Sequence, residues 1–124
     1  MNQLNIHETK RTPEVFFDPN GTLRIKGRSI PEDASKFFDP LYKWLCEYAQ
    51  ATNTDTKLDV ILEYFNSGSA KALLHMLKLV VNLRNDHKHT VIINWHFENG
   101  DDDILERGQY YSSILNFEFK YFEI

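Results

Sequence analysis

Apolar residues recur along the chain with two different periods, and these periods predict the main elements of the fold. Over residues 40–49 and 70–84, apolar side chains return every three or four positions, which is typical of a helix with one buried face. Residues 57–65 and 90–97 are short apolar runs, which are typical of strands inside a sheet. The pattern therefore predicts strands that alternate with helices.

The two ends of the chain add a hairpin and a closing strand. Residues 15–17 and 23–26 are expected to be strands, and residues 18–21 (DPNG) suit the turn between them because Pro19 fixes φ and Gly21 accepts a positive φ. Apolar and polar residues alternate again from Phe117 onward. Residues 1–12 are polar and aperiodic, so we expect a flexible arm there and one domain over residues 13–124.

Two capping patterns predict where helices begin. Ser29 and Glu32 have the spacing of a capping box, and Asp103 and Glu106 form a second pattern of the same kind. Pro40 is expected to interrupt the first helical segment, because a proline inside a helix lacks the N–H that a regular helix uses. We therefore expect one short helical turn, followed by a main helix from about residue 40 to 49.

The order of the expected elements is ββαβαβαβ, which predicts an α/β fold. Strands that alternate with helices favour a mixed, mostly parallel sheet with crossover helices, here preceded by the N-terminal β-hairpin. In the strand over residues 57–65, regular alternation places Leu58, Val60, Leu62 and Tyr64 on one face and Phe65 on the other.

Composition and charge restrict the function classes. With 124 residues, 42% of them hydrophobic, the chain suits one folded domain. A net charge of −4 argues against binding to nucleic acid through phosphate contacts. No apolar run approaches the ~20 residues of a membrane span, so we expect a cytoplasmic protein with no membrane partner. Cys46, the single cysteine, cannot form an internal disulfide and is expected to be buried.

Two clusters of possible metal ligands give only weak indications of a metal site. His87 and His89 lie in a polar loop without a third ligand at a suitable spacing. The acidic run at residues 101–103 lacks the spaced oxygens of a calcium loop, and carboxylates at the start of a helix explain it. We expect no metal and no cofactor.

The segment LEYFNSGSAK, residues 62–71, joins a strand to a helix, which is where α/β sheets place functional residues. One serine suffices as the N-cap, so Ser69 could cap the helix while Ser67 stays exposed. Lys71 is unexpected in the first turn, because the helix dipole disfavours a cation there. Its presence is easier to understand if an anion comes close.

A serine hydrolase is an alternative interpretation of the same segment. The G-x-S-x-G pattern is absent around Ser67 and Ser69. A catalytic triad would need His75 and a carboxylate, from Asp59 or Glu63, to converge on the serine.

Three segments resemble the SiaC family of bacterial regulatory phosphoproteins, namely GRSIPEDASKFFDPLYKWLCEYA, LEYFNSGSAK and INWHFENGDDDILERGQYY. The match runs from residue 13 to 119, and its most specific parts are G-x-S-x-P-E and Y-[FL]-N-[ST]-x-S-x-K. The family's fold is similar to that of STAS domains, the anti-sigma-factor antagonists. The resemblance therefore implies a single STAS-like domain and a regulator without catalytic activity of its own.

The resemblance also implies a function for the serine segment. In the family, the hydroxyl that follows the motif asparagine is phosphorylated by a partner serine/threonine kinase and dephosphorylated by a PP2C-type phosphatase, and the unmodified protein activates a diguanylate cyclase. That hydroxyl is Ser67 here, with Ser69 as the alternative, and the partner-binding surface would comprise Asn66, Ser67, Gly68, Ser69 and Lys71. The family commonly has threonine in place of Ser67 and serine in place of Gly68. An output like that of the anti-sigma-factor antagonists remains an alternative.

Overall fold

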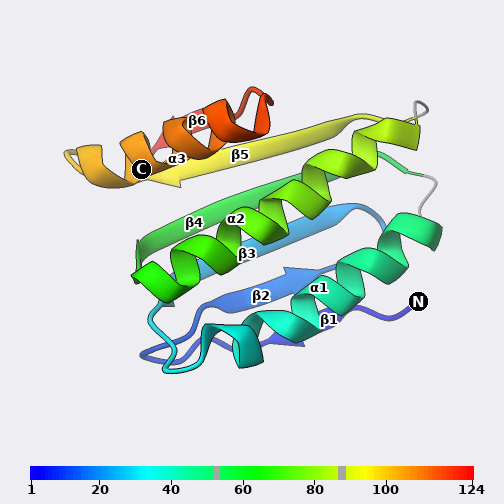
Figure 1. Ribbon diagram of the computed structural model, residues 1–124, viewed down its shortest axis with the longest axis horizontal. Coiled ribbons are helices and arrows are strands. Elements are labelled where there is room, and N and C mark those ends of the chain that lie inside the picture. The colour runs from blue at the N-terminus through cyan, green and yellow to red at the C-terminus, as the bar shows by residue number, and fades with distance from the viewer. Residues whose placement is uncertain (52–53, 87–88) are drawn as a thin grey trace.

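The computed structural model describes residues 1–51, 54–86 and 89–124, and it places three α-helices beside a six-stranded sheet (Figure 1). The elements, in chain order, are β1 (Leu4–Ile6), β2 (Glu14–Phe17), β3 (Thr22–Ser29), α1 (Ala34–Ala51), β4 (Thr56–Phe65), α2 (Ser67–Val81), the 3₁₀ helix η1 (Asn82–Asp86), β5 (Val91–Phe97), α3 (Asp102–Leu115) and β6 (Lys120–Glu123).

The strands lie in the sheet in the order of the chain, from β1 to β6. β1, β2 and β3 are antiparallel neighbours, whereas β3, β4, β5 and β6 run parallel to one another. The hairpin turns at Gly21, whose φ of 102° favours glycine. This arrangement confirms the predicted mixed, mostly parallel sheet with an N-terminal hairpin and crossover helices.

The prediction of a flexible arm over residues 1–12 was wrong for its central part. Leu4–Ile6 form the edge strand β1, and Leu4 pairs with Phe17 of β2. The indole Nε1 of Trp44 also donates to the carbonyl of Asn2 at 2.9 Å. A three-residue edge strand is too short to show a period in the sequence, and backbone pairing with β2 holds it in place.

All three α-helices cover the same face of the sheet (Figure 1). Each parallel pair from β3 to β6 is joined by a helix, and right-handed crossovers that advance in one direction place their helices on one side. Leu58 and Val60 of β4 are buried beneath the helices, while Asp59 between them is only partly covered. The core is therefore a single layer between helices and sheet, with Leu73 and Leu77 of α2 fully buried in it.

α1 is one continuous helix, so the predicted break at Pro40 does not occur. Residues on both sides of the proline share one buried face, formed by Phe38, Leu41, Leu45 and Tyr48. Burial of this face offsets the hydrogen bond that the proline cannot make, since packing routinely overrides local propensity. Cys46 lies off the buried face and is exposed, contrary to the prediction.

A β-bulge changes which residues of β4 face the core. Gly27 pairs with Leu62 and the next residue, Arg28, pairs with Tyr64, so Glu63 is an extra residue in β4. After the bulge the alternation is reversed, because one inserted residue exchanges the two faces. Tyr64 is therefore exposed and Phe65 is fully buried, the opposite of the predicted continuation of the Leu58 face.

Candidate functional site

The strand-to-helix junction between β4 and α2 is organised by Asn66. Its side-chain Oδ1 accepts a hydrogen bond from Ser69 N at 2.9 Å, which makes Asn66 the N-cap of α2. Its own backbone N–H donates to Ser29 O at 3.0 Å, which links the junction to the end of β3. Neither serine caps the helix, because the asparagine immediately before them does so.

The two serines of the junction have opposite environments. Ser69 is fully buried, and its Oγ lies 2.8 Å from Oγ of Ser29, which is also fully buried. Ser67 is exposed as the first residue of α2, and among the described residues its hydroxyl has no hydrogen-bond partner. Ser69 is therefore a structural residue, and only Ser67 presents its hydroxyl to the exterior.

The predicted capping box of Ser29 and Glu32 is not formed. Ser29 is the last residue of β3, and Asp33 begins α1 by accepting a hydrogen bond from Lys36 N at 3.1 Å. Glu32 is exposed and lies 3.4 Å from a guanidinium nitrogen of Arg11. The pattern failed because Ser29 continues a strand, so its hydroxyl is directed into the core.

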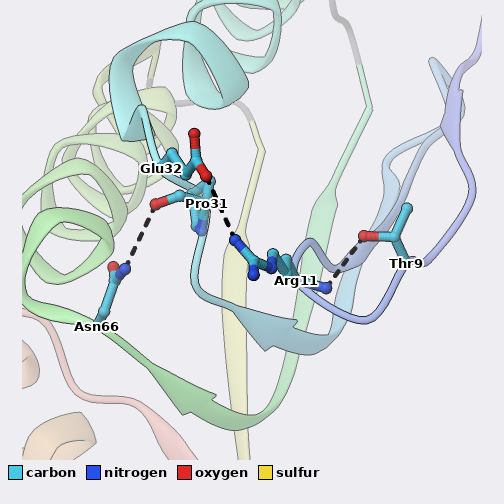
Figure 2. A network of polar contacts seen from close by, with 5 residues as sticks. All are labelled: Thr9, Arg11, Pro31, Glu32 and Asn66. Atoms are coloured by element: carbon cyan, nitrogen blue, oxygen red, sulfur yellow. Dashed lines mark hydrogen bonds and ion pairs between the residues drawn. The ribbon is translucent and has the colours of Figure 1, made fainter.

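Figure 2 shows the loop after β3 lying between the N-terminal segment and the junction. Asn66 Nδ2 donates to Pro31 O at 3.4 Å, and Arg11 contacts Glu32 on the other side of the loop. Arg11 O also accepts a hydrogen bond from Ile30 N at 2.8 Å. The N-terminal segment, the loop and the Asn66 cap therefore form one polar network beside Ser67.

The second predicted cap lies two residues away from the observed one. Asp101 is the N-cap of α3, because its carboxylate accepts a hydrogen bond from Ile104 N at 3.1 Å. Asp103 lies inside the first turn and pairs with Arg107 at 3.3 Å, while Glu106 is exposed. Three consecutive aspartates offer several possible N-caps for α3, and the spacing of Asp103 to Glu106 selected the wrong one.

Ser67 borders an open groove between α2 and α3 that has a volume of about 460 Å³. The groove is lined by residues of both helices: Ser67, Ala70, Lys71, Leu74, Arg107, Tyr110 and Tyr111. Lys71 is exposed, and its helical spacing of four from Ser67 places both on one face of α2. The predicted serine and lysine are therefore together, beside residues of α3 that the sequence analysis missed.

Arg107 is the most relevant of these missed residues. Its guanidinium donates to Phe65 O at 3.1 Å and lies 4.5 Å from the centre of the Phe65 ring. Tyr111, one turn later on α3, donates to Ala70 O at 2.7 Å and so joins the two walls of the groove. Burial raises the pKa of Tyr111 to about 12. The charge of Arg107 lowers this pKa and Tyr110 raises it, both by less than burial does.

The residues required for a hydrolase do not converge. His75 lies two turns beyond Ser67 on α2, and its ring packs edge-on against Tyr42 at 4.6 Å. Asp59 contacts His96 Nε2 at 3.0 Å, on the face of the sheet away from the helices. Within the described part of the chain, no hydrogen bond joins Ser67 to a histidine.

No group of three His, Cys, Asp or Glu side chains is placed to hold a metal ion in residues 1–51, 54–86 and 89–124. His87 and Lys88 of the candidate histidine cluster lie outside the described residues. Among the helices that the structure describes, none is both long enough and apolar enough to cross a membrane.

The fold and the site define a small α/β domain that displays one serine hydroxyl at a strand-to-helix junction, beside two cations of a surface groove. The model of the SiaC family, described as SiaC family regulatory phosphoprotein, matches residues 6–124. The chain belongs to this family. It is therefore a regulatory protein and not an enzyme.

Individual proteins are also similar to this chain. A Pseudomonas aeruginosa (strain UCBPP-PA14) protein described as uncharacterised is 26% identical over 120 residues, which cover 96% of this chain and 94% of that protein. The solved structure of SiaC of Pseudomonas aeruginosa is 26% identical with a TM-score of 0.84, and covers 100% of this chain and 98% of its own.

A further solved structure shares the fold and contains a partner protein. It is the crystal structure of the diguanylate cyclase SiaD in complex with its activator SiaC from Pseudomonas aeruginosa. The matched chain has a TM-score of 0.89 at 24% identity, and the match covers 98% of this chain and 99% of that one.

Proposed function

We propose that this protein is the phosphorylatable component of a partner-switching system. A cognate serine/threonine kinase phosphorylates Ser67, and a PP2C-type phosphatase removes the phosphate. The unphosphorylated protein binds and activates a diguanylate cyclase in the cytoplasm.

The observation that carries this proposal is the contrast between the two serines of the junction. A kinase must reach the hydroxyl, and Ser67 is exposed whereas Ser69 is fully buried against Ser29. The first N–H groups of α2 have no acceptor inside the helix, so an added phosphate is acceptable at Ser67. The burial of Ser69 supports Ser67 over Ser69 as the phosphorylated residue.

The identity of the partner is supported by the comparison with SiaC. That protein is the activator of a diguanylate cyclase in its complex, and this chain has the same fold along almost its whole length. The exposed part of the junction, Ser67, Gly68 and Lys71, is the surface that a partner can contact directly. Asn66 and Ser69 contribute by holding the shape of that surface, because their side chains are engaged in the cap and in the core.

Electrostatics is sufficient to explain the switch. A phosphate adds about −1.5 to −2 charges at neutral pH together with a strongly bound hydration shell. Placed on Ser67, it would lie inside any interface built around the junction and would disfavour docking. No change of fold is required, since Ser67 does not contribute to the buried core.

The test is phosphorylation by the cognate kinase, followed by tandem mass spectrometry and a binding assay with the cyclase. We expect one phosphate, on Ser67. Ser67→Ala should abolish modification and preserve binding to the cyclase, while the phosphorylated protein should lose that binding.

Ser113 provides a control, because it is also an exposed helical serine and it lines neither surface pocket that contains Lys71. Ser113→Ala should leave phosphorylation and binding unchanged. Phosphate on another residue, or full cyclase binding by the phosphorylated protein, would contradict the proposal. Recovery of a protein of the anti-sigma-factor type in place of the cyclase would identify a different output for the same switch.

A further inference from the structure

The groove between α2 and α3 has a charge opposite to that of the whole molecule. The chain carries a net charge of −4, but the described residues that line the groove beside Ser67 include two cations, Lys71 and Arg107, and no acidic residue. The remaining lining is apolar or aromatic, including Leu74 and Tyr110. A positive groove with an apolar base is suited to an anion that is brought to it by a covalent connection or by a partner.

Lys71 has no carboxylate partner among the described residues, although acidic side chains are abundant in the chain. It lies one helical turn after Ser67, where residues four positions apart are neighbours on the helix surface. Its ammonium group can therefore reach an anion attached to the Ser67 side chain.

Arg107 is held in place more firmly and retains donors that are not used. Nη1 donates to Phe65 O, Nε pairs with Asp103 at 3.3 Å, and the guanidinium lies over the Phe65 ring. In the described structure, Nη2 has no acceptor. The pair with Asp103 is a surface ion pair, since 69% of the Asp103 side chain is exposed, and such pairs are weak. Arg107 is thus oriented by Phe65 and can accept a second anion.

The distance between the two helices is fixed at the same point. Tyr111 donates to Ala70 O at 2.7 Å, so the residue between Ser69 and Lys71 is joined directly to α3. The groove between Lys71 and Arg107 is consequently formed before any anion arrives, which lowers the cost of binding.

We propose that Lys71 and Arg107 together form a receptor for the phosphate of phosphorylated Ser67. This inference rests on the proposed phosphorylation of Ser67. Lys71 Nζ and the free Nη2 of Arg107 donate to the phosphate oxygens. The ion pair between Arg107 and Asp103 is weakened as a result. Phosphorylation then has two effects on a partner with an acidic docking segment, because it adds negative charge and also occupies both cations of the groove.

The inference can be tested on the protein alone by installing phosphoserine at position 67 during translation and following its phosphorus-31 NMR signal with pH. An exposed phosphoserine has a second pKa of about 6. Two cations that donate to the dianion favour the charged form, so we expect this second pKa to be lower by about one unit or more.

Variants separate the receptor from a general effect of charge. Lys71→Ala and Arg107→Gln should each raise the second pKa toward that of the same protein unfolded in urea. Asp103→Asn should lower it further, because it removes the carboxylate that competes for Arg107. Lys78→Ala is the matched control, since Lys78 is an exposed lysine of the same helix that does not line the groove.

The inference would be overturned if the second pKa of the phosphoserine were the same in the folded protein and in urea. It would also be overturned if Lys71→Ala and Lys78→Ala changed this pKa equally. Thermal unfolding of each variant verifies that the fold is retained. Because the phosphoserine is installed without a kinase, failure of this test leaves the kinase assay unaffected. Conversely, if no kinase modifies Ser67, the second pKa of the installed phosphoserine still tests whether Lys71 and Arg107 bind the phosphate.

Discussion

Gly68 occupies the second position of α2 although its backbone conformation does not require glycine. A Cβ added there would lie 3.6 Å from Cβ of Ala34 and 3.8 Å from Oδ1 of Asn66, which are ordinary contact distances. We therefore expect Gly68→Ala to stabilise the protein by about 0.5–1 kcal/mol, because alanine loses less conformational entropy in a helix. The midpoint of urea unfolding measures this change, and a lower midpoint would contradict the described start of α2.

Gly108 of α3 gives the matched substitution with the opposite sign. A Cβ at Gly108 would lie 2.5 Å from Nε1 of Trp95, a side chain that is fully buried and donates to Ile104 O. Since the indole cannot move without breaking its packing, Gly108→Ala should destabilise the protein by about 1–3 kcal/mol. The same unfolding assay applies, and equal effects of the two substitutions would show that α3 is placed differently against the sheet.

The buried pair of Ser29 and Ser69 predicts non-additive mutations. Each single change to alanine leaves one hydroxyl without its partner in the core, which should cost about 1–3 kcal/mol. The double variant removes both polar groups, so its loss should be smaller than the sum of the two single losses by at least about 0.5 kcal/mol. Additive losses in urea unfolding would mean that the two hydroxyls do not depend on each other.

At the scale of the elements, the sequence predicted which segments are helices and strands better than where they begin. The apolar faces of α1 and α2 are long enough to be recognised from their period alone, and β5 is recognised as a short apolar run. Two of the errors lie at Pro40 and Glu63, where one residue departs from the local rule. In both cases burial of the surrounding apolar residues determines the outcome, through a continued helix or through a bulge, and a short sequence window does not contain that information.

The contact between α2 and α3 predicts a pH dependence of stability. Burial raises the pKa of Tyr111 from 10 in the unfolded chain to about 12 in the folded one, so folding favours the protonated phenol that donates to Ala70 O. Its contribution is complete below pH 10 and is lost as the pH rises from about 10 to 12. In Tyr111→Phe, the decrease in the free energy of unfolding that is due to ionisation of Tyr111 should be absent, as measured by urea unfolding between pH 9 and 12. An unchanged profile in the variant would mean that another group causes it.

Because the helices lie on one face of the sheet, the molecule has two unlike sides (Figure 1). The side without helices carries polar pairs that satisfy one another, such as Arg24 with Glu14 at 2.7 Å and Asp59 with His96 at 3.0 Å. The helical side carries Ser67 and the groove with two free or partly free cations. The proposed chemistry is therefore confined to one side and one end of the molecule.

This division explains how much of the site the sequence could reveal. Ser67 and Lys71 belong to one short segment, so their motif and spacing are visible in the chain. Arg107 comes from α3, 40 residues after Ser67, and only the parallel crossovers after β4 and β5 bring it beside Phe65. A local motif cannot contain that proximity, and the aspartates before Arg107 indicate only a helix start.

The separation of the two sides predicts how far the effect of phosphorylation extends. Since Ser67 is exposed and the core beneath α2 is fully packed, phosphoserine at position 67 should alter amide hydrogen exchange only near it, in the first turn of α2 and in α3 around Arg107. Opening free energies of β3, β4 and β5 should change by less than about 0.5 kcal/mol, as for surface substitutions. Ser67→Ala serves as the uncharged control and should resemble the unmodified protein throughout. Weaker protection across the central strands in the phosphorylated protein alone would show that the switch acts by loosening the fold, and a local electrostatic block would then be the wrong mechanism.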